Sequence, residues 1–226
     1  PGEVTIKCRD GFVYNGTTYK IIEFGRSDGI NNMWTNTPNN FLPFVGKLDF
    51  SNNSYLTAIN HNIFLADGAT YVSEINLSGC TNLRTIGDNA FKGIGGFKSG
   101  SHTIQGGGVK IDLTDCNKLT TIGNNVIESL KEITIPSSVT TIGNNALQTG
   151  DPVGSCNVII NEGTAQLSTL TLGTNVFNQS LTHFDIYNVH TDAVKNDWIT
   201  KITSAGGLEA NITFHGLVDT VGISAV

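Results

Sequence analysis

A repeated phrase constrains this chain more than any other feature. Residues 75–91 read INLSGCTNLRTIGDNAF, and residues 111–127 read IDLTDCNKLTTIGNNVI. A copy at residues 133–147 is two residues shorter in its middle, and residues 48–64 keep the same pattern with more substitutions. Such repeats predict a stacked solenoid, because a single unit of this size cannot bury its apolar side alone.

The first apolar residue of each Ile-X-Leu-like stretch marks the origin of a coil. These origins are Leu48, Ile75, Ile111, Ile133, Val158, Phe184 and Ile212. Their spacings are 27, 36, 22, 25, 26 and 28 residues, and most lie within the ~20–29 residues of a leucine-rich repeat. The longest interval contains the glycine-rich residues 92–108, which predict a mobile loop.

Within each coil, two halves have different expected roles. The alternation in residues 75–77 predicts a short strand with Asn76 facing outward. A small polar side chain follows, Asn53, Cys80 or Cys116, and is expected to be buried where it satisfies the turning backbone. In the second half we expect glycines to allow a tight turn, at Gly87, Gly123 and Gly143. We expect asparagines to cap a short helical or 3₁₀ turn, at Asn89, Asn125 and Asn145.

Both ends differ from the middle and are expected to cap the stack. Residues 4–24 predict a hairpin of Val4–Cys8 and Phe12–Tyr14 against Thr18–Phe24, with a turn at Asn15-Gly16. Residues 31–43 are Asn-rich and irregular, and residues 191–202 predict a helix that begins after Thr191 or Asp192.

The predicted fold is a right-handed leucine-rich-repeat solenoid of the α/β type, dominated by strands. It has one short parallel strand per coil, an irregular or 3₁₀ convex side, a β-hairpin N-cap and a helical C-cap. We expect a single domain over residues 1–226. Residues 1–46 form the N-terminal β cap, residues 47–183 the repeats, and residues 184–226 a last coil with the helical cap.

Composition narrows the class of function. The 226 residues carry a net charge of −6, and only 14% of them are charged. An acidic chain without a basic cluster argues against nucleic acid as a partner, and no apolar run approaches the ~20 residues that span a bilayer. The polar but largely uncharged amino-acid composition is typical of an exported protein. The start at Pro1-Gly2 leads us to expect a mature or trimmed fragment whose signal peptide has been removed.

The wording of residues 130–147, LKEITIPSSVTTIGNNAL, resembles the BspA-type leucine-rich repeat family. Phe184–Tyr187, followed by a helix over residues 192–198, is similar to the C-terminal capping unit of that family. The resemblance covers about residues 45–200. It implies a bacterial cell-surface or secreted protein, of a kind common in Bacteroidetes, that adheres to a host or bacterial surface protein. No catalytic residues come with the family.

The strand face is the predicted partner-binding surface, because solenoids often bind partners on this extended surface. Its outward residues are Asp49, Asn76, Asp112, Thr134, Ile159, Asp185 and Thr213, and Tyr187 lies beyond Asp185. They are flanked by Lys47, Glu74, Lys110, Glu132, Asn157, His183 and Asn211. Ile159 and Tyr187 are candidate anchors, and Asp49, Asp112 and Asp185 are expected to set the ligand preference. The alternative is that these residues are polar only to keep the face soluble.

Other kinds of chemistry find little support in the sequence. The five histidines are scattered without zinc-site spacing, and the Asp-X-Asp-X-Asp-Gly calcium loop is absent, so no metal or cofactor is predicted. A structural calcium ion stays open as an alternative. No nucleophile elbow or zinc-protease helix occurs, and Phe97 stands where a phosphate loop needs the glycine before Lys98. We therefore expect no enzyme.

The four cysteines are expected to be free thiols. Cys80 and Cys116 would lie on neighbouring coils, where in-register side chains have poor geometry for a disulfide. Two other functions remain open. One is glycan binding through polar side chains and exposed aromatic residues such as Trp34 or Trp198, although Trp198 is expected on the buried face of the cap helix. The other is a spacer that displays another domain.

Overall fold

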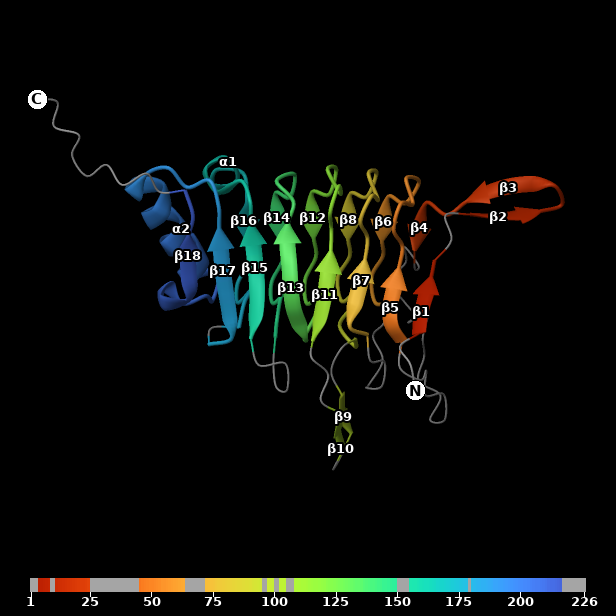
Figure 1. Ribbon diagram of the computed structural model, residues 1–226, viewed down its shortest axis with the longest axis horizontal. Helices are drawn as coiled ribbons and strands as arrows, with labels where there is room; N and C mark the ends of the chain where they lie inside the picture. Colours follow the sequence, from red (N-terminus) through yellow and green to blue (C-terminus); the bar gives the residue numbers. More distant parts are fainter. Residues whose placement is uncertain are drawn as a thin grey trace, which may run out of the picture.

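Two parallel β-sheets, one behind the other, dominate the computed structural model of the chain (Figure 1). The structure describes residues 4–8, 11–24, 45–63, 72–94, 97–99, 102–104, 108–149, 155–178 and 180–216. The predicted irregular segment at residues 31–43, with Trp34, lies outside these residues. Each turn of the chain from β1 to β16 contributes one strand to each sheet, and β17 and β18 extend the first sheet alone, so the coils stack side by side.

The first sheet has eight strands in the order β1-β5-β7-β11-β13-β15-β17-β18. Their bounds are β1 Val4–Lys7, β5 Val45–Asp49, β7 Glu74–Asn76, β11 Val109–Asp112, β13 Leu130–Ile135, β15 Cys156–Ile160, β17 Thr182–Ile186 and β18 Ile212–Phe214. The predicted coil origins pair in register across it, from Leu48 opposite Ile75 to Phe184 opposite Ile212. The predicted spacing of the coils is therefore confirmed.

The second sheet has six strands in the order β16-β14-β12-β8-β6-β4. Their bounds are β4 Glu23–Phe24, β6 Ala58–Ile59, β8 Thr85–Ile86, β12 Thr121–Ile122, β14 Thr141–Ile142 and β16 Thr171–Leu172. The predictions of one strand per coil and of an irregular or 3₁₀ convex side are therefore wrong. The physical reason is the repeated Thr-Ile pair, whose β-branched side chains favour extended backbone, with the isoleucine turned into the core.

The core fills the space between the two sheets with the same apolar positions from coil to coil. The first sheet contributes Leu48, Ile75, Ile111, Ile133, Val158 and Phe184, all at most 3% exposed. The second contributes Ile59, Ile86, Ile122 and Ile142, all at most 1% exposed. Burial of each such side chain is worth about 1.5–3 kcal/mol, and stacking makes the stabilisation continuous along the molecule.

The Gly-X-Asn turns work differently from the prediction. Gly87, Gly123 and Gly143 do not have positive φ. A Cβ atom on Gly143 would lie 2.7 Å from the carbonyl carbon of Gly123 in the coil before it, so glycine is required by close approach of the coils. The left-handed residues are instead the asparagines two positions later, including Asn125 (φ 50°) and Asn145 (φ 50°). Their predicted role as caps of a helical turn is wrong, because these residues lie in turns that lead into no helix.

Two hairpins depart from the predicted boundaries. The N-terminal hairpin is formed by β2 (Gly11–Tyr14) and β3 (Thr17–Lys20) and extends beyond the first coil (Figure 1). The prediction that Val4–Cys8 and Phe24 belong to it is wrong, because β1 pairs with β5 and β4 pairs with β6. The glycine-rich residues 92–108 contain a second hairpin, of β9 (Phe97–Ser99) and β10 (His102–Ile104), where a loop without strands was expected.

The C-terminal end carries the helices. α1 (Gly163–Leu167) was not predicted, whereas α2 (Asp192–Ser204) confirms the helical cap, with the Thr191 hydroxyl accepting a bond from the Val194 amide at 3.2 Å. A short 3₁₀ helix, η1 (Glu209–Asn211), precedes β18. Among the described residues, no helix combines the length and the apolar character that crossing a bilayer requires.

Candidate functional site

The predicted outward residues do lie together on the outer face of the first sheet. Asp49 is opposite Asn76, and Asn76 is opposite Asp112. Further along the sheet, Thr134 is opposite Ile159, and Ile159 is opposite Asp185. Because neighbouring strands are ~4.8 Å apart, Asp112 and Asp185 are separated by about three strand spacings. The three predicted carboxylates therefore do not form a single site.

At the N-terminal part of this face, the polar side chains support the backbone. Oδ1 of Asp49 accepts a bond from the Ser51 amide at 3.0 Å, Asn76 does the same for Ser78 at 3.0 Å, and Asp112 for Thr114 at 2.9 Å. Each closes an Asx turn where its strand ends. These three residues have a structural role in addition to any role in binding.

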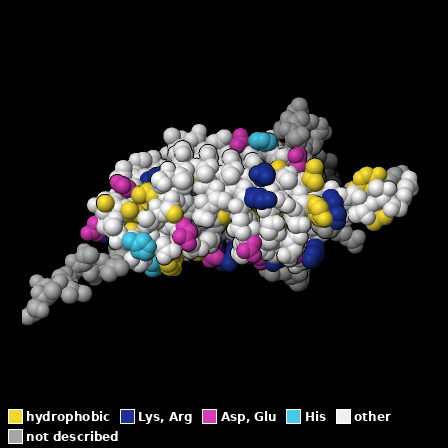
Figure 2. All heavy atoms as spheres, turned by 90° about the horizontal axis from the view of Figure 1, so that it is seen from above, with side chains coloured by type: hydrophobic (Ala, Val, Ile, Leu, Met, Phe, Trp, Pro, Cys, Tyr) yellow, Lys and Arg dark blue, Asp and Glu magenta, His cyan; other side chains and the backbone are white. Residues whose placement is uncertain are grey.

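The flanking row carries charges that neutralise one another between coils. Lys47 contacts Glu74 at 2.8 Å, and Lys110 contacts Glu132 at 2.8 Å. Such exposed pairs add little stability, about 0–1 kcal/mol each, but they leave little net charge over β5 to β13. Figure 2 looks onto the molecule from above, at the turns rather than at this face, and there too most of the visible surface is uncharged.

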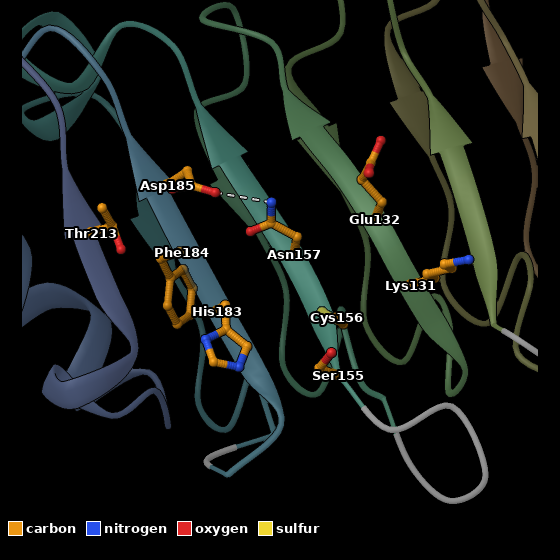
Figure 3. A pocket seen from close by; sticks show the side chains of 9 residues that line it. All are labelled: Lys131, Glu132, Ser155, Cys156, Asn157, His183, Phe184, Asp185 and Thr213. Atoms are coloured by element: carbon orange, nitrogen blue, oxygen red, sulfur yellow. Dashed lines mark hydrogen bonds between the residues drawn. The ribbon is translucent and has the colours of Figure 1, made fainter.

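At the C-terminal part of the same face the surface is hollowed (Figure 3). The hollow has a volume of about 410 Å³ and lies across β13, β15, β17 and β18. Its polar lining includes Lys131, Glu132, Asn157, His183, Asp185 and Thr213. The predicted residues Asp185 and Thr213 thus meet the flanking residues Glu132, Asn157 and His183 here.

Asp185 is held by bonds from two other strands or their ends. His215 Nε2 lies 2.9 Å from Oδ1 of Asp185, and Asn157 Nδ2 donates to Oδ2 at 3.0 Å. The bond from His215 lowers the pKa of Asp185, burial opposes it, and the bond from Asn157 adds to the lowering. Asp185 is therefore ionised at neutral pH.

Tyr187 stands beside this group as an exposed aromatic residue. Its ring stacks on the ring of His215, with centroids 4.1 Å apart and an angle of 9° between the planes. Stacking on His215 fixes the position of this ring. Tyr187 is nevertheless 39% exposed, so part of its surface faces solvent. Ile159, the other predicted anchor, is half-buried on β15.

Sequence reasoning missed His215, which it treated as one of several scattered histidines. The signal was present in the register of the coils. Phe184 is opposite Ile212, so three residues further along each strand Tyr187 and His215 become neighbours. Extending the predicted register by three residues would have found the pair.

The cysteines lie where the repeat predicted them. Cys80 and Cys116 are buried, and their Sγ atoms donate to the carbonyl oxygens of Phe50 and Leu77, each at 3.2 Å. All four cysteines are free thiols. Asn53 fills the equivalent position on the earlier coil and accepts bonds from the amides of Tyr55 and Leu56 at 3.0 and 3.1 Å. These side chains satisfy the turning backbone, as predicted.

The thiols are expected to be unreactive in the folded protein. Burial raises the pKa of Cys80 to about 11 and that of Cys116 to about 12, from an ordinary value of 9.0. A chromogenic thiol reagent should titrate neither until the chain is unfolded. The pKa values of these two thiols are higher in the folded chain than in the unfolded chain. The stability that the two buried, protonated thiols contribute is therefore complete below pH 9 and is lost as the pH rises toward 11–12. Rapid reaction of Cys80 or Cys116 in the native state would contradict this.

Other expected features give no second site in the described part of the chain. Within it, no group of three or more His, Cys, Asp and Glu residues could hold a metal ion. Trp198 is fully buried, and its Nε1 donates to the Gly163 carbonyl at 2.8 Å, so it offers no surface to a sugar. Comparison of the chain with protein-family models, with curated proteins and with solved structures gave no match.

Proposed function

We propose that this chain is a leucine-rich-repeat module of the BspA type, secreted or held at a cell surface, that binds a protein partner and performs no catalysis. The in-register coils and the repeat wording at residues 130–147 support the solenoid class. The binding surface is the strand face of the first sheet, centred on its C-terminal part. The partner is a host or bacterial surface protein.

The exposed, immobilised ring of Tyr187 is the observation that carries this proposal. Aromatic residues dominate the energetics of protein interfaces, most of all when their conformation is fixed before binding. Stacking on His215, which is itself bonded to Asp185, fixes this ring in the free protein. Asp185, two residues before Tyr187 in the chain, lines the hollow and is opposite the half-buried Ile159, so the aromatic anchor has polar neighbours on the same face.

Glycan binding remains the second candidate. Of its two predicted aromatic platforms, Trp198 is buried and Trp34 lies outside the described residues. The spacer interpretation predicts no ligand on this face at all. One binding screen, described next, distinguishes glycan binding and the spacer role from protein binding.

The test is a binding screen of the purified chain against extracellular-matrix and bacterial-surface proteins on one panel and polysaccharides on the other. For a protein that binds, Tyr187→Ala should weaken the affinity roughly 30-fold, the loss typical of a hot-spot residue. Tyr55→Ala is the matched control, because Tyr55 is 43% exposed, compared with 39% for Tyr187, but does not lie on the strand face.

The outcomes separate the candidates. A loss in Tyr55→Ala without a loss in Tyr187→Ala would place the contact away from the strand face. Binding to polysaccharides alone would favour the glycan candidate, and the absence of binding on both panels would favour the spacer.

A further inference from the structure

The N-terminal hairpin carries an Asn-Gly pair at its tip. Asn15 and Gly16 are the two loop residues between β2 and β3, and their φ angles are 48° and 75°. Positive φ at both loop residues is what a type I′ turn requires. Both residues are exposed, and the hairpin projects beyond the first coil (Figure 1), so solvent reaches the turn.

The carboxamide of Asn15 and the backbone amide of Gly16 are both free to react. No hydrogen bond in the described part of the chain uses either group. A Cβ atom added to Gly16 would meet nothing within 4 Å, so the space beside the Gly16 nitrogen is open. The electrophilic carbon of the carboxamide and the neighbouring backbone nitrogen are therefore available to one another.

We propose that Asn15 is a site of spontaneous deamidation. The Gly16 nitrogen gives its proton to a solvent base and attacks Cγ of Asn15. The new N–Cγ bond closes a succinimide ring, and the Cγ–Nδ2 bond breaks to release ammonia. Water then opens the ring at either carbonyl carbon, which yields aspartate or isoaspartate. The net reaction takes up water, releases ammonia and adds a negative charge to the hairpin.

The hairpin allows the change of conformation that this attack needs. The Asn15 backbone must rotate out of the turn, and a following glycine presents no Cβ atom to hinder the ring. β2 and β3 form a sheet of two strands, and all four residues of β3 are exposed. A hairpin of this kind is marginally stable in water. It therefore opens locally far more often than the stack of coils unfolds.

Asn188 provides an internal comparison, because it is also exposed and has a φ of 57°. Its Nδ2 donates to the Asn161 carbonyl at 2.8 Å. The next residue, Val189, is buried, and its amide donates to the His215 carbonyl at 3.2 Å. Both groups that would react are thus held in place, so Asn188 should be protected although it shares the backbone conformation of Asn15.

Formation of isoaspartate should open the hairpin without disturbing the stack. Isoaspartate carries the chain through its side-chain carbon and so lengthens the backbone of a turn whose two residues match the twist of the strands. Pairing of Phe12 with Tyr19 is therefore expected to be lost. The change stays local, because the Ile22 carbonyl accepts bonds from the amide and the hydroxyl of Thr57, at 2.6 and 2.8 Å, and ties the base of the hairpin to the first coil.

The test is incubation of the purified chain in mildly alkaline buffer, with and without urea, followed by peptide mass spectrometry. In the folded protein, Asn15 should lose ammonia at least about tenfold faster than Asn188, and at a rate within about tenfold of its own rate in urea, because the hairpin opens locally. A smaller ratio between the two asparagines would overturn the proposal. So would a greater slowing of Asn15 by folding, since the turn would then protect it.

Two variants check the structural consequence by NMR of the ¹⁵N-labelled chain. Asn15→Gly keeps a residue that accepts positive φ and should retain the hairpin signals of Phe12 and Tyr19 throughout the incubation. Asn15→Asp, which imitates the aspartate product, should retain them as well. The isoaspartate fraction of the wild-type chain should lose these signals while its midpoint of urea unfolding stays unchanged. Loss of the signals in incubated Asn15→Gly, or their survival in the isoaspartate fraction, would contradict the assigned effect.

Discussion

Replacing Gly123 with valine is expected to cost about 3 kcal/mol or more, as severe overpacking does, and to leave little folded protein at 37 °C. A Cβ atom at this position would lie 2.7 Å from the Asp88 nitrogen and 2.8 Å from the Gly87 carbonyl carbon. Both are backbone atoms of the preceding coil. They cannot move aside without breaking the hydrogen bond that the Gly123 amide donates to the Ile86 carbonyl at 2.8 Å.

The effect should spread beyond the turn, because the same contact repeats between coils. Gly143 packs on Gly123, and Gly173 packs on Gly143, with Cβ distances of 2.7 and 2.8 Å to the respective carbonyl carbons. Widening the stack at this turn disturbs the pairing of both sheets, since the coils on either side of Gly123 contribute strands to both. A loss of this size is a large fraction of the about 5–15 kcal/mol that stabilises a typical domain.

Urea unfolding followed by circular dichroism measures this cost. Gly123→Ala should already lower the midpoint, and Gly123→Val should lower it further. Thr114→Ala is the control, because Thr114 is an exposed residue of the same coil. If Gly123→Val unfolded at the same urea concentration as Thr114→Ala, the close approach of the coils would not be what selects glycine there.

The coil origins could be predicted from the sequence because two independent patterns agree. The period-two alternation at residues 75–77 marks a half-buried strand, and the repeat places the same pattern on the next coil at Ile111. In the structure Ile75 and Ile111 are opposite one another. Stacking then fixes every later coil by the same rule, which is why the register held as far as Ile212.

The second sheet escaped prediction because its strands are two residues long. A pair such as Thr121-Ile122 is too short to show any alternation. The following asparagine is equally ambiguous, because asparagine is favoured both as a helix cap and in the left-handed conformation. Only the structure shows that Asn125 takes the second role.

The candidate site was predicted in part for a related reason. Outward positions such as Asp185 and Tyr187 follow from alternation along one strand. Their partners His215 and Asn157 come from other coils, 30 and 28 residues from Asp185 in sequence. Which side chain bonds to which depends on side-chain geometry across coils, and no pattern within one repeat specifies it.

Truncation of Trp198 to alanine is expected to be the most damaging change at the C-terminal end. The side chain is 0% exposed and lies on α2, and its Nε1 donates to the Gly163 carbonyl on α1 at 2.8 Å. Loss of a buried tryptophan typically costs about 3–5 kcal/mol. The Gly163 carbonyl increases this loss of stability further, because the substitution leaves it buried without a hydrogen-bond donor.

Trp198→Phe separates the two contributions. It keeps most of the ring volume but removes the N–H donor, so it should cost about 1–3 kcal/mol, the cost of an unsatisfied buried acceptor. Asn196→Ala, at an exposed position of the same helix, should be close to neutral in urea unfolding. If Trp198→Ala and Trp198→Phe lowered the free energy of unfolding equally, the hydrogen bond alone would hold the cap helix in place. A larger loss for alanine means that α2 closes the stack chiefly by filling the end of its core, as the coils in the middle do for one another.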